Sequence, residues 1–325
     1  MVSPDPFRAT GNTKSRVMRL RLPTPPQGSV PEGASRQWLV VEAPTHCYIP
    51  KVLEQKGLAG YEPEALACFL AATAVARPGA VWDIGANIGV YGLLARALTR
   101  RAVRGFEPSP DLAHLADDIS VANGLPYPVE RIALGAQTGT ATLYLSDVTD
   151  SSNSLAAGFR PSSQTLLVPV ETVDDVVRRT GETPAVLKID TETTEPDVLR
   201  GAEHLIRVHR PWILCEVLAN RSEKALMEVL RPWQYRWFPV SDDLPFTDVD
   251  SIRGDPSYHN LMWLFTPEPP GQQFWDLVAA WRKELTSCGP VITGAARLRS
   301  RRRLVKLIRY PFRGARTLLS HANRP

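Results

Sequence analysis

Apolar residues along most of the chain alternate between short continuous runs and stretches with a helical period. The runs predict buried β-strands at 80–84, 102–106, 129–134, 185–189, 212–217, 235–240 and 260–265. The helical period predicts helices at 62–76, 111–123, 196–208, 222–230 and 273–285, and a further helix that ends at 98. Strands and helices that alternate in this way are typical of a parallel sheet with crossover helices, so we predict an α/β fold.

Two segments break this alternation. Thr140–Leu145 and Leu166–Thr172 alternate apolar and polar residues, which predicts a hairpin-like pair with one exposed face. The intervening segment, Ser146 to Gln164, is a long loop, and loops of that length are commonly functional. Its polar residues 151–154 are candidates for a substrate rim, although serine-rich loops are usually only solvated.

The chain divides by composition into three regions. Residues 1–35 are rich in proline, glycine and serine without a sustained period, so we predict a disordered N-terminus. Residues 36–270 hold the alternating pattern and form the predicted domain. Residues 271–325 are predicted to be a helical, basic C-terminal extension.

The net charge of +4 is distributed unevenly. From Leu285 onward there are ten Lys or Arg residues and no Asp or Glu, and removing those ten leaves residues 1–284 at −6. An acidic body argues against nucleic acid as a partner. The basic segment 295–320 has an apolar face as a helix, which favours peripheral contact with an anionic membrane, although Pro311 limits a continuous helix. A solvated terminus, or a helix that docks on the acidic body, explains the pattern equally well.

The four cysteines form no CxxC motif or Cys/His cluster, and the six histidines show no metal-ligand spacing. A reducing compartment fits this usage, and we find neither a secretory signal nor an apolar run long enough to span a bilayer. We therefore expect a cytoplasmic protein, which the basic tail would bring to the membrane surface if it binds there. We also expect that the protein needs no metal.

The segment Val81-Trp-Asp-Ile-Gly-Ala-Asn-Ile-Gly89 follows a predicted strand and opens a helix. Gly85 permits a tight turn, and Gly89 permits close approach of a ligand to the backbone. The segment lacks the G-x-G-x-x-G spacing of dinucleotide sites, where an aspartate at the strand end would repel the pyrophosphate. Asp83 instead suits a sulfonium ligand that carries an amino group.

The second strand ends in Gly105-Phe-Glu-Pro108, which places an acidic residue at the same edge of the sheet. Glu107 can accept hydrogen bonds from both hydroxyls of an adenosine ribose. The alternative is that the glycine turn and this acid are ordinary loop residues of an α/β fold, since short glycine motifs recur by chance.

A third strand brings two more carboxylates to this edge. Asp190 and Glu192 follow the predicted strand 185–189, where they can orient a methyl acceptor or take its proton. The alternative for Glu192 is that it only favours the start of the following helix. His259 precedes the last strand and is a further candidate base, although a surface loop explains it as well.

Together these motifs resemble the FkbM-type methyltransferases. The resemblance covers roughly residues 60–265 and rests on Asp83-Ile-Gly-Ala-Asn-Ile-Gly89, Phe106-Glu-Pro108, Lys188-Ile-Asp190, Glu195-Pro-Asp-Val-Leu-Arg-Gly201 and Ile213-Leu-Cys-Glu216. It implies a Rossmann-like class I methyltransferase fold, a mostly parallel sheet with an antiparallel C-terminal strand. It also implies S-adenosyl-L-methionine as methyl donor and transfer to oxygen, usually a hydroxyl of a sugar, glycan or natural product.

The resemblance also assigns roles to single residues. The methionine end of the cofactor would be lined by Asp83, Gly85, Asn87 and Gly89. Glu107 would hold the ribose, and Asp190 would face the reacting centre. One departure is that the family often has Glu-Gly-Ala-Glu where this chain has Glu192-Thr-Thr-Glu195, which leaves the role of Glu192 open.

Two other functions stay open at this stage. A nicotinamide-dependent oxidoreductase on a related fold is disfavoured by the missing third glycine and by Asp83, which would stand where a phosphate binds. A non-catalytic adaptor would keep the fold and use the basic tail for binding. The sequence favours the methyltransferase.

Overall fold

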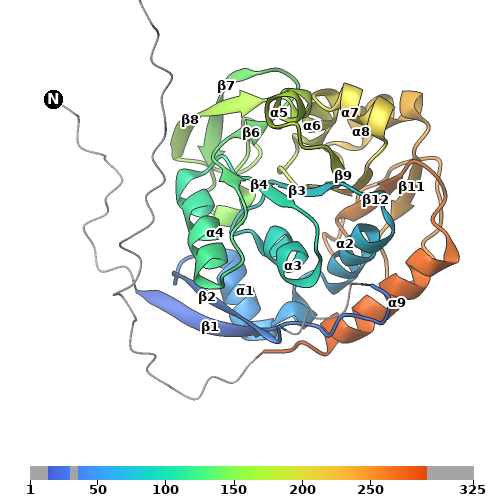
Figure 1. The fold of residues 1–325 in the computed structure, drawn as a ribbon. Coiled ribbons are helices and arrows are strands. Elements are labelled where there is room, and N and C mark those ends of the chain that lie inside the picture. Colours follow the sequence, from blue (N-terminus) through green and yellow to red (C-terminus); the bar gives the residue numbers. More distant parts are fainter. Residues whose placement is uncertain (1–13, 30–35, 291–325) are drawn as a thin grey trace, which may run out of the picture. The chain divides into compact units, whose positions relative to one another are not determined.

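The computed structural model describes residues 14–29 and 36–290, and a seven-stranded sheet runs through this described part (Figure 1). Its strands lie in the spatial order β11 (Arg236–Pro239), β12 (Met262–Thr266), β10 (Trp212–Glu216), β9 (Pro184–Ile189), β3 (Ala80–Ile84), β4 (Val103–Phe106) and β5 (Val129–Glu130). Neighbouring strands are parallel except at β12, which is antiparallel to both of its neighbours. The predicted mostly parallel α/β sheet with an antiparallel C-terminal strand is therefore confirmed.

Helices cover both faces of this sheet. On one face pack α1 (Tyr48–Lys56), α2 (Pro63–Val75), α3 (Val90–Leu98), α4 (Pro110–Ala122) and α9 (Gln272–Thr286). On the other pack α5 (Val173–Thr180), α6 (Glu195–Arg200), α7 (Glu203–His209) and α8 (Glu223–Leu230). Successive side chains of β3 point to opposite faces, so Val81 belongs to the first core and Trp82 to the second. Both side chains are fully buried, which explains the continuous apolar run.

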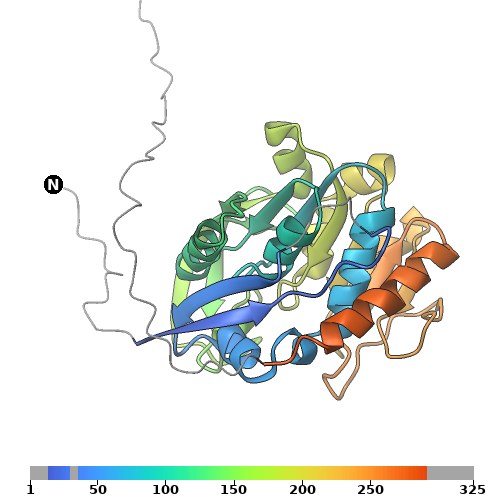
Figure 2. The same cartoon turned by 60° about the horizontal axis from the view of Figure 1, so that its bottom comes forward.

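The last described helix belongs to this core. Trp281 of α9 is 1% exposed and packs in the same cluster as Leu66 and Phe69 of α2, and the two helices lie side by side in Figure 2. The predicted domain boundary at residue 270 is therefore wrong, because the apolar face of α9 needs α2 to be buried. The basic segment 295–320 and its predicted membrane contact lie outside the described residues.

An N-terminal hairpin joins the same face as α2 and α9. Strands β1 (Ser15–Arg21) and β2 (Trp38–Pro44) pair antiparallel in full register. Alternate side chains of the two strands, among them Leu20 and Leu39, point into the core. The prediction of a disordered stretch 1–35 is therefore wrong for residues 15–21, while 1–13 and 30–35 lie outside the described residues.

A small second sheet lies beside the edge strand β5. Its strands, in the order β6-β8-β7, are β6 (Ala133–Leu134), β8 (Gln164–Glu171) and β7 (Gly139–Leu145). The antiparallel β7–β8 pair confirms the predicted hairpin-like pair. The single strand predicted at 129–134 is divided, because its first half pairs with β4 and its second half with β8.

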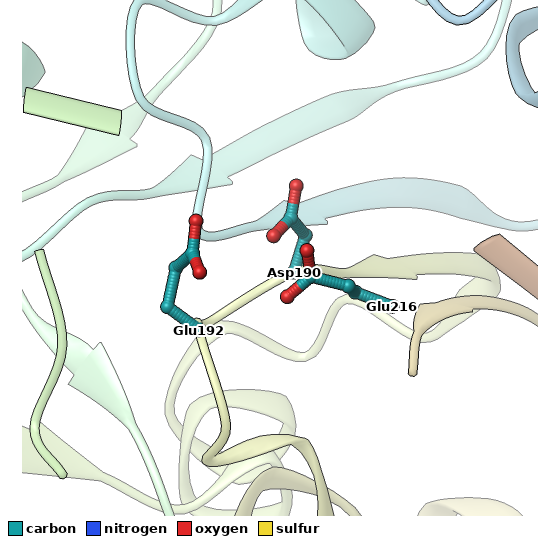
Figure 3. Close-up of side chains that lie close together, drawn as sticks. All are labelled: Asp190, Glu192 and Glu216. Atoms are coloured by element: carbon teal, nitrogen blue, oxygen red, sulfur yellow. The ribbon is translucent and has the colours of Figure 1, made fainter. Parts of the chain in front are cut away.

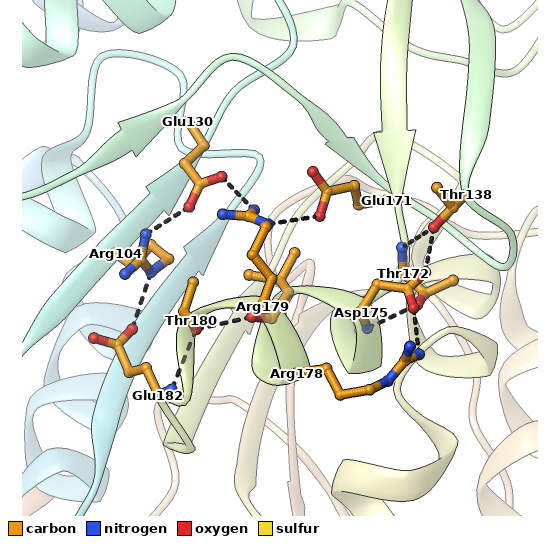
Figure 4. Close-up of polar contacts among 11 residues, drawn as sticks. Arg104, Glu130, Thr138, Glu171, Thr172, Asp175, Arg178, Arg179, Thr180 and Glu182 are labelled. Atoms are coloured by element: carbon orange, nitrogen blue, oxygen red, sulfur yellow. Dashed lines mark hydrogen bonds and ion pairs between the residues drawn. The ribbon is translucent and has the colours of Figure 1, made fainter. Parts of the chain in front are cut away.

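Ion pairs connect the small sheet to the large one (Figure 4). Glu130 of β5 binds Arg104 of β4 at 2.5 Å and Arg179 of α5 at 2.6 Å. Arg179 in turn binds Glu171 of β8 at 3.0 Å. These shared contacts fix the position of β8 relative to the edge of the main sheet. The long loop that joins β7 to β8 is thereby held near that edge.

The helix predicted at 196–208 is two helices, α6 and α7. The carboxylate of Asp174 accepts hydrogen bonds from the backbone N–H groups of His204 and Leu205, at 2.8 and 2.9 Å, and so caps a new helix start.

Short 3₁₀ helices are η1 (Leu58–Gly60), η2 (Asp150–Ser152) and η3 (Arg231–Trp233). In the described part of the chain, every helix is too short or too polar to span a bilayer.

Candidate active site

A cavity of about 280 Å³ lies over the carboxyl ends of β3, β4, β9 and β10. Strand ends and the loops that follow them supply most of its lining. The charged lining residues are Glu62, Glu107, Asp150, Lys188, Asp190, Glu192 and Glu216. Six of these seven are acidic, so the described lining offers many oxygen acceptors, and the acidic groups that are ionised attract cationic ligands.

Asp83 lies beneath this cavity rather than in its lining. Its side chain is fully buried, and one carboxylate oxygen accepts a 2.9 Å hydrogen bond from the backbone N–H of Gly92 in the first turn of α3. Burial raises the pKa of Asp83, and Lys188 counteracts this effect. The structure therefore places Asp83 outside the lining, where its hydrogen bond to Gly92 fixes the start of α3.

The two glycines of the first turn avoid clashes within the protein. Gly85 has φ of +73°, and a Cβ there would lie 1.8 Å from the carbonyl oxygen of Asp190. Gly89 has φ of +79°, and a Cβ would lie 2.3 Å from the hydroxyl of Tyr127. Gly85 lines the cavity and Gly89 does not. Both positions exclude side chains, which keeps the turn tight against β9 and Tyr127.

Glu107 connects the ends of β3 and β4. Its two carboxylate oxygens accept backbone N–H groups from Asn87, at 2.8 Å, and Ser109, at 2.9 Å. Burial raises the pKa of Glu107 to about 7, although both hydrogen bonds favour the ionised form. Each oxygen keeps a second lone pair, which can accept a ligand hydroxyl. Asn87 also lines the cavity, and its amide oxygen accepts the N–H of Ile88 at 2.8 Å.

Lys188 is the one basic side chain among the described lining residues. Its ammonium lies 3.0 Å from Asp190 and 3.7 Å from Asp83, and it donates a 3.1 Å hydrogen bond to the carbonyl of Gly85. Burial alone would lower the pKa of Lys188, but the carboxylates of Asp190 and Asp83 hold it above its ordinary value. Lys188 therefore stays charged and fixes Asp190 at the mouth of the cavity.

The turn after β9 is organised by Glu195. One of its oxygens accepts the backbone N–H groups of Thr191, at 2.9 Å, and Thr193, at 3.1 Å. Within this turn Glu192 and Thr193 have φ of +58° and +89°. A positive φ is costly for a β-branched residue, and the family often has glycine at the position of Thr193. The turn directs Glu192 into the cavity even though that glycine is missing.

Three carboxylates converge at one end of the cavity (Figure 3). An oxygen from each of Asp190, Glu192 and Glu216 lies within 4.8 Å of one from the others. Burial, followed by the charges of Asp190 and Glu195, raises the pKa of Glu192 to about 9. Burial and the charges of Asp190 and Glu192 raise the pKa of Glu216 well above its ordinary value. We assigned no role to Glu216 from the sequence, although it ends the buried run of β10.

The remaining wall comes from segments far away in the sequence. Tyr48, Tyr61 and Glu62 of the N-terminal region line the cavity, and the sequence analysis did not identify them. No motif marks them, because they reach the site only through the packing of α1 and α2. The loop after β7 contributes residues 150, 151 and 153–155. His259 does not line the cavity: its exposed ring lies 3.0 Å from the hydroxyl of Ser257, a position that does not favour the role of base.

The lining fits S-adenosyl-L-methionine by its chemistry. Glu107 offers free lone pairs at the end of β4, where ribose hydroxyls bind in folds of this type. Apolar side chains beside it, such as Leu112 and Ile132, offer a surface for the adenine ring. The acidic excess suits the sulfonium and amino groups, and Asn87 and the backbone at Gly85 would face the methionine end.

Strand order, the single antiparallel strand and a site at the carboxyl ends of β3 and β4 together define a class I methyltransferase fold. The chain belongs to the FkbM methyltransferase family, because the profile of the Methyltransferase FkbM domain matches residues 83–291. S-adenosyl-L-methionine is the cofactor of such a domain. The predicted family and cofactor are thereby confirmed.

Several solved structures resemble the chain at low sequence identity. The methyltransferase FkbM of Methylobacillus flagellatus is 17% identical with a TM-score of 0.38, and the match covers 58% of this chain and 43% of that one. Precorrin-6y C5,15-methyltransferase of Geobacter metallireducens is 10% identical, with a TM-score of 0.36 and coverage of 62% and 85%. Magnesium protoporphyrin IX methyltransferase of Synechocystis, solved with bound cofactor, is 13% identical, with a TM-score of 0.34 and coverage of 63% and 78%. None of the curated proteins compared with the chain matches it.

Proposed function

We propose that the chain transfers a methyl group from S-adenosyl-L-methionine to a hydroxyl oxygen of a sugar, glycan or natural product. The observation that carries this proposal is the position of Asp190. Its carboxylate lines the same cavity as Glu107, two strands away across β3, and its side chain is 26% exposed while the neighbouring Lys188 is 4% exposed. A partly exposed carboxylate beside the cofactor half can reach an acceptor that enters from solvent.

The bound cofactor supplies an electrophilic methyl group, and its transfer forms a carbon–oxygen bond as a carbon–sulfur bond breaks. The protein must then hold the acceptor oxygen in line and accommodate its proton. Asp190 accepts the hydrogen bond of the acceptor hydroxyl and receives this proton, while Lys188 keeps the carboxylate in place. Glu192 lies close enough to bind a neighbouring hydroxyl.

The lining supports a hydroxyl-bearing acceptor. Carboxylates accept hydrogen bonds and donate none when ionised, so they match the hydroxyl donors of a sugar. The side chains of Ser151 and Asn153 add polar contacts from the loop after β7. Tyr48 and Tyr61 add aromatic side chains to the lining, which suit the apolar face of a sugar ring or of a polyketide.

The test is Asp190→Asn, which keeps the shape of the side chain and removes its charge. We expect turnover to fall about 10²-fold or more, with little change in cofactor affinity. Formation of S-adenosylhomocysteine is measured with a panel of glycosides and hydroxylated polyketides and a matched panel of amines. The control is Asp197→Asn, since Asp197 is half exposed on α6 and lies outside the cavity. Equal turnover of Asp190→Asn and wild type, or transfer only to amines, would contradict the proposal.

A further inference from the structure

The three converging carboxylates have more acceptor capacity than their surroundings satisfy. Glu216 is 5% exposed, and its Oε2 has no hydrogen-bond partner although it is buried. Figure 3 shows its carboxyl group directed at Asp190 and Glu192. A buried carboxylate oxygen without a partner costs free energy unless a ligand satisfies it, so this atom indicates a bound group at that point.

The charges near this cluster are also unbalanced. Lys188 is the one basic side chain among the described lining residues, and it is engaged by Asp190, Asp83 and the carbonyl of Gly85. Neither Glu192 nor Glu216 forms an ion pair with Lys188 or with any other cation in the described part of the chain, although the charge of Arg160 acts on Glu192. Carboxylates this close repel one another in a buried setting, and a positive ligand between them removes that repulsion.

The spacing and the ligand type fit a divalent metal ion. The donor atoms of the three residues are all oxygens and no two of them are further apart than 4.8 Å. Ca²⁺ binds oxygen at about 2.3–2.6 Å, so ligands on opposite sides of it are separated by about 4.6–5.2 Å. Mg²⁺, with bonds of about 2.0–2.1 Å, would require the side chains to move closer together. Sites made of carboxylates select ions such as Mg²⁺, Ca²⁺ and Mn²⁺ over ions that prefer nitrogen or sulfur.

We propose that Asp190, Glu192 and Glu216 bind a divalent cation at the acceptor end of the cavity. The binding of the ion by these three residues does not depend on the proposed function. The role that we give to the ion, which is to hold the acceptor, rests on the proposed function. An ion held by three protein ligands keeps open coordination positions that face the cavity, and these can bind one or two hydroxyl oxygens of the acceptor. The ion would then fix the acceptor in place, which departs from the expectation that the site needs no metal.

The experiment titrates the full-length protein with MnCl₂ at neutral pH and follows free Mn²⁺ by electron paramagnetic resonance. We expect one saturable site with a dissociation constant below about 1 mM, competed by CaCl₂. Glu216→Gln should weaken the affinity for Mn²⁺ at least tenfold. Glu192→Gln should have the same effect, and it replaces the first variant in the test if Glu216→Gln does not fold. Glu203→Gln is the matched control, because Glu203 is exposed on α7 and should bind Mn²⁺ as wild type does.

The outcomes separate this proposal from the proposed function. No saturable Mn²⁺ binding by folded wild type, or unchanged binding by both glutamine variants, overturns the cation site. If methyl transfer to a hydroxyl then persists in EDTA, the proposed function stands without a metal. Saturable binding that both variants weaken supports the site, even if no hydroxyl acceptor is methylated.

Discussion

Glu107 combines a structural role with the ligand-binding role that we propose for its carboxylate. It accepts the N–H groups of Asn87 and Ser109, and so holds together the two loops that surround the cofactor half of the cavity. Burial raises the pKa of Glu107 to about 7 in the folded protein. The folded state therefore loses stability as the pH rises from the pKa of the unfolded chain to 7, because the buried carboxyl group must ionise. Ligand hydroxyls that donate to the carboxylate recover part of this cost.

This pKa predicts how cofactor affinity changes with pH. Ribose hydroxyls favour the ionised form of Glu107, so affinity should weaken as the pH falls from 8 to 6, by at most about tenfold per pH unit. Calorimetry with S-adenosylhomocysteine across this range measures the effect. Glu107→Gln should weaken binding by about 1–3 kcal/mol and flatten the pH dependence. An equal slope in that variant would assign the titration to another group.

At the residue scale, the site residues that could be predicted from the sequence are those that stand in a motif at a strand end. Asn87, Glu107, Asp190 and Glu192 follow strand ends, and the structure gathers them around one cavity. Asp83 was expected among them, but hydrogen bonding to the start of α3 turns its side chain below the cavity. His259 stands at a strand start with no motif around it, and the structure leaves it outside.

The turn from Thr191 to Glu195 shows a local conflict between sequence and backbone. Thr193 adopts φ of +89°, and its buried hydroxyl has no hydrogen-bond partner. Both features cost free energy at the same residue. The turn persists because Glu195 accepts two of its N–H groups and Ser154 donates a 2.6 Å hydrogen bond to the carbonyl of Glu192.

Replacing Thr193 with glycine should therefore stabilise the protein. Glycine adopts this φ without strain and removes the unpaired hydroxyl, a gain of about 1–2 kcal/mol after its greater unfolded entropy is counted. Thermal and urea unfolding measure the change. Thr193→Ala is the control, since it removes the hydroxyl but keeps the Cβ, and should gain less. A glycine variant less stable than wild type would show that the turn is not strained.

At the element scale, hydrophobic runs predicted where the central strands lie but not how each ends. A run of apolar residues indicates that a strand is buried, but it does not indicate which neighbouring strand it pairs with. The segment 129–134 therefore divides between two sheets, and the helix predicted at 196–208 divides where Asp174, distant in sequence, caps α7. The N-terminal hairpin of β1 and β2 escaped prediction, because β1 lies among prolines and glycines without a sustained period.

At the scale of the whole molecule, α9 completes the core around α2. Phe274, Trp281 and Leu285 are each at most 1% exposed in this position. Each such side chain contributes about 1.5–3 kcal/mol by its burial, and the total stability of a domain is only about 5–15 kcal/mol. The helix is therefore part of the domain and not an extension of it.

Truncations should separate α9 from the residues that follow it. A chain that ends after residue 290 should fold and bind S-adenosylhomocysteine as the full chain does, because the described cavity residues lie between 48 and 261. A chain that ends after residue 270 should fail to fold, since α2 loses its partner. Circular dichroism and thermal shift with the ligand test both. A stable shorter chain would show that α9 contributes little.

The N-terminal wall of the cavity has a consequence for how such enzymes diversify. Tyr48, Tyr61 and Glu62 line the cavity, yet they precede residue 83, where the match to the FkbM domain begins. The lining of the cavity is therefore encoded in two separate stretches of the gene. Exchange or gradual change of the upstream stretch can alter which acceptor is admitted while the methyl-donor half stays intact. The acceptor contacts that we propose are in that sense divided between two parts of the gene, because Asp190 and Glu192 lie inside the matched region and Tyr48 and Tyr61 lie before it.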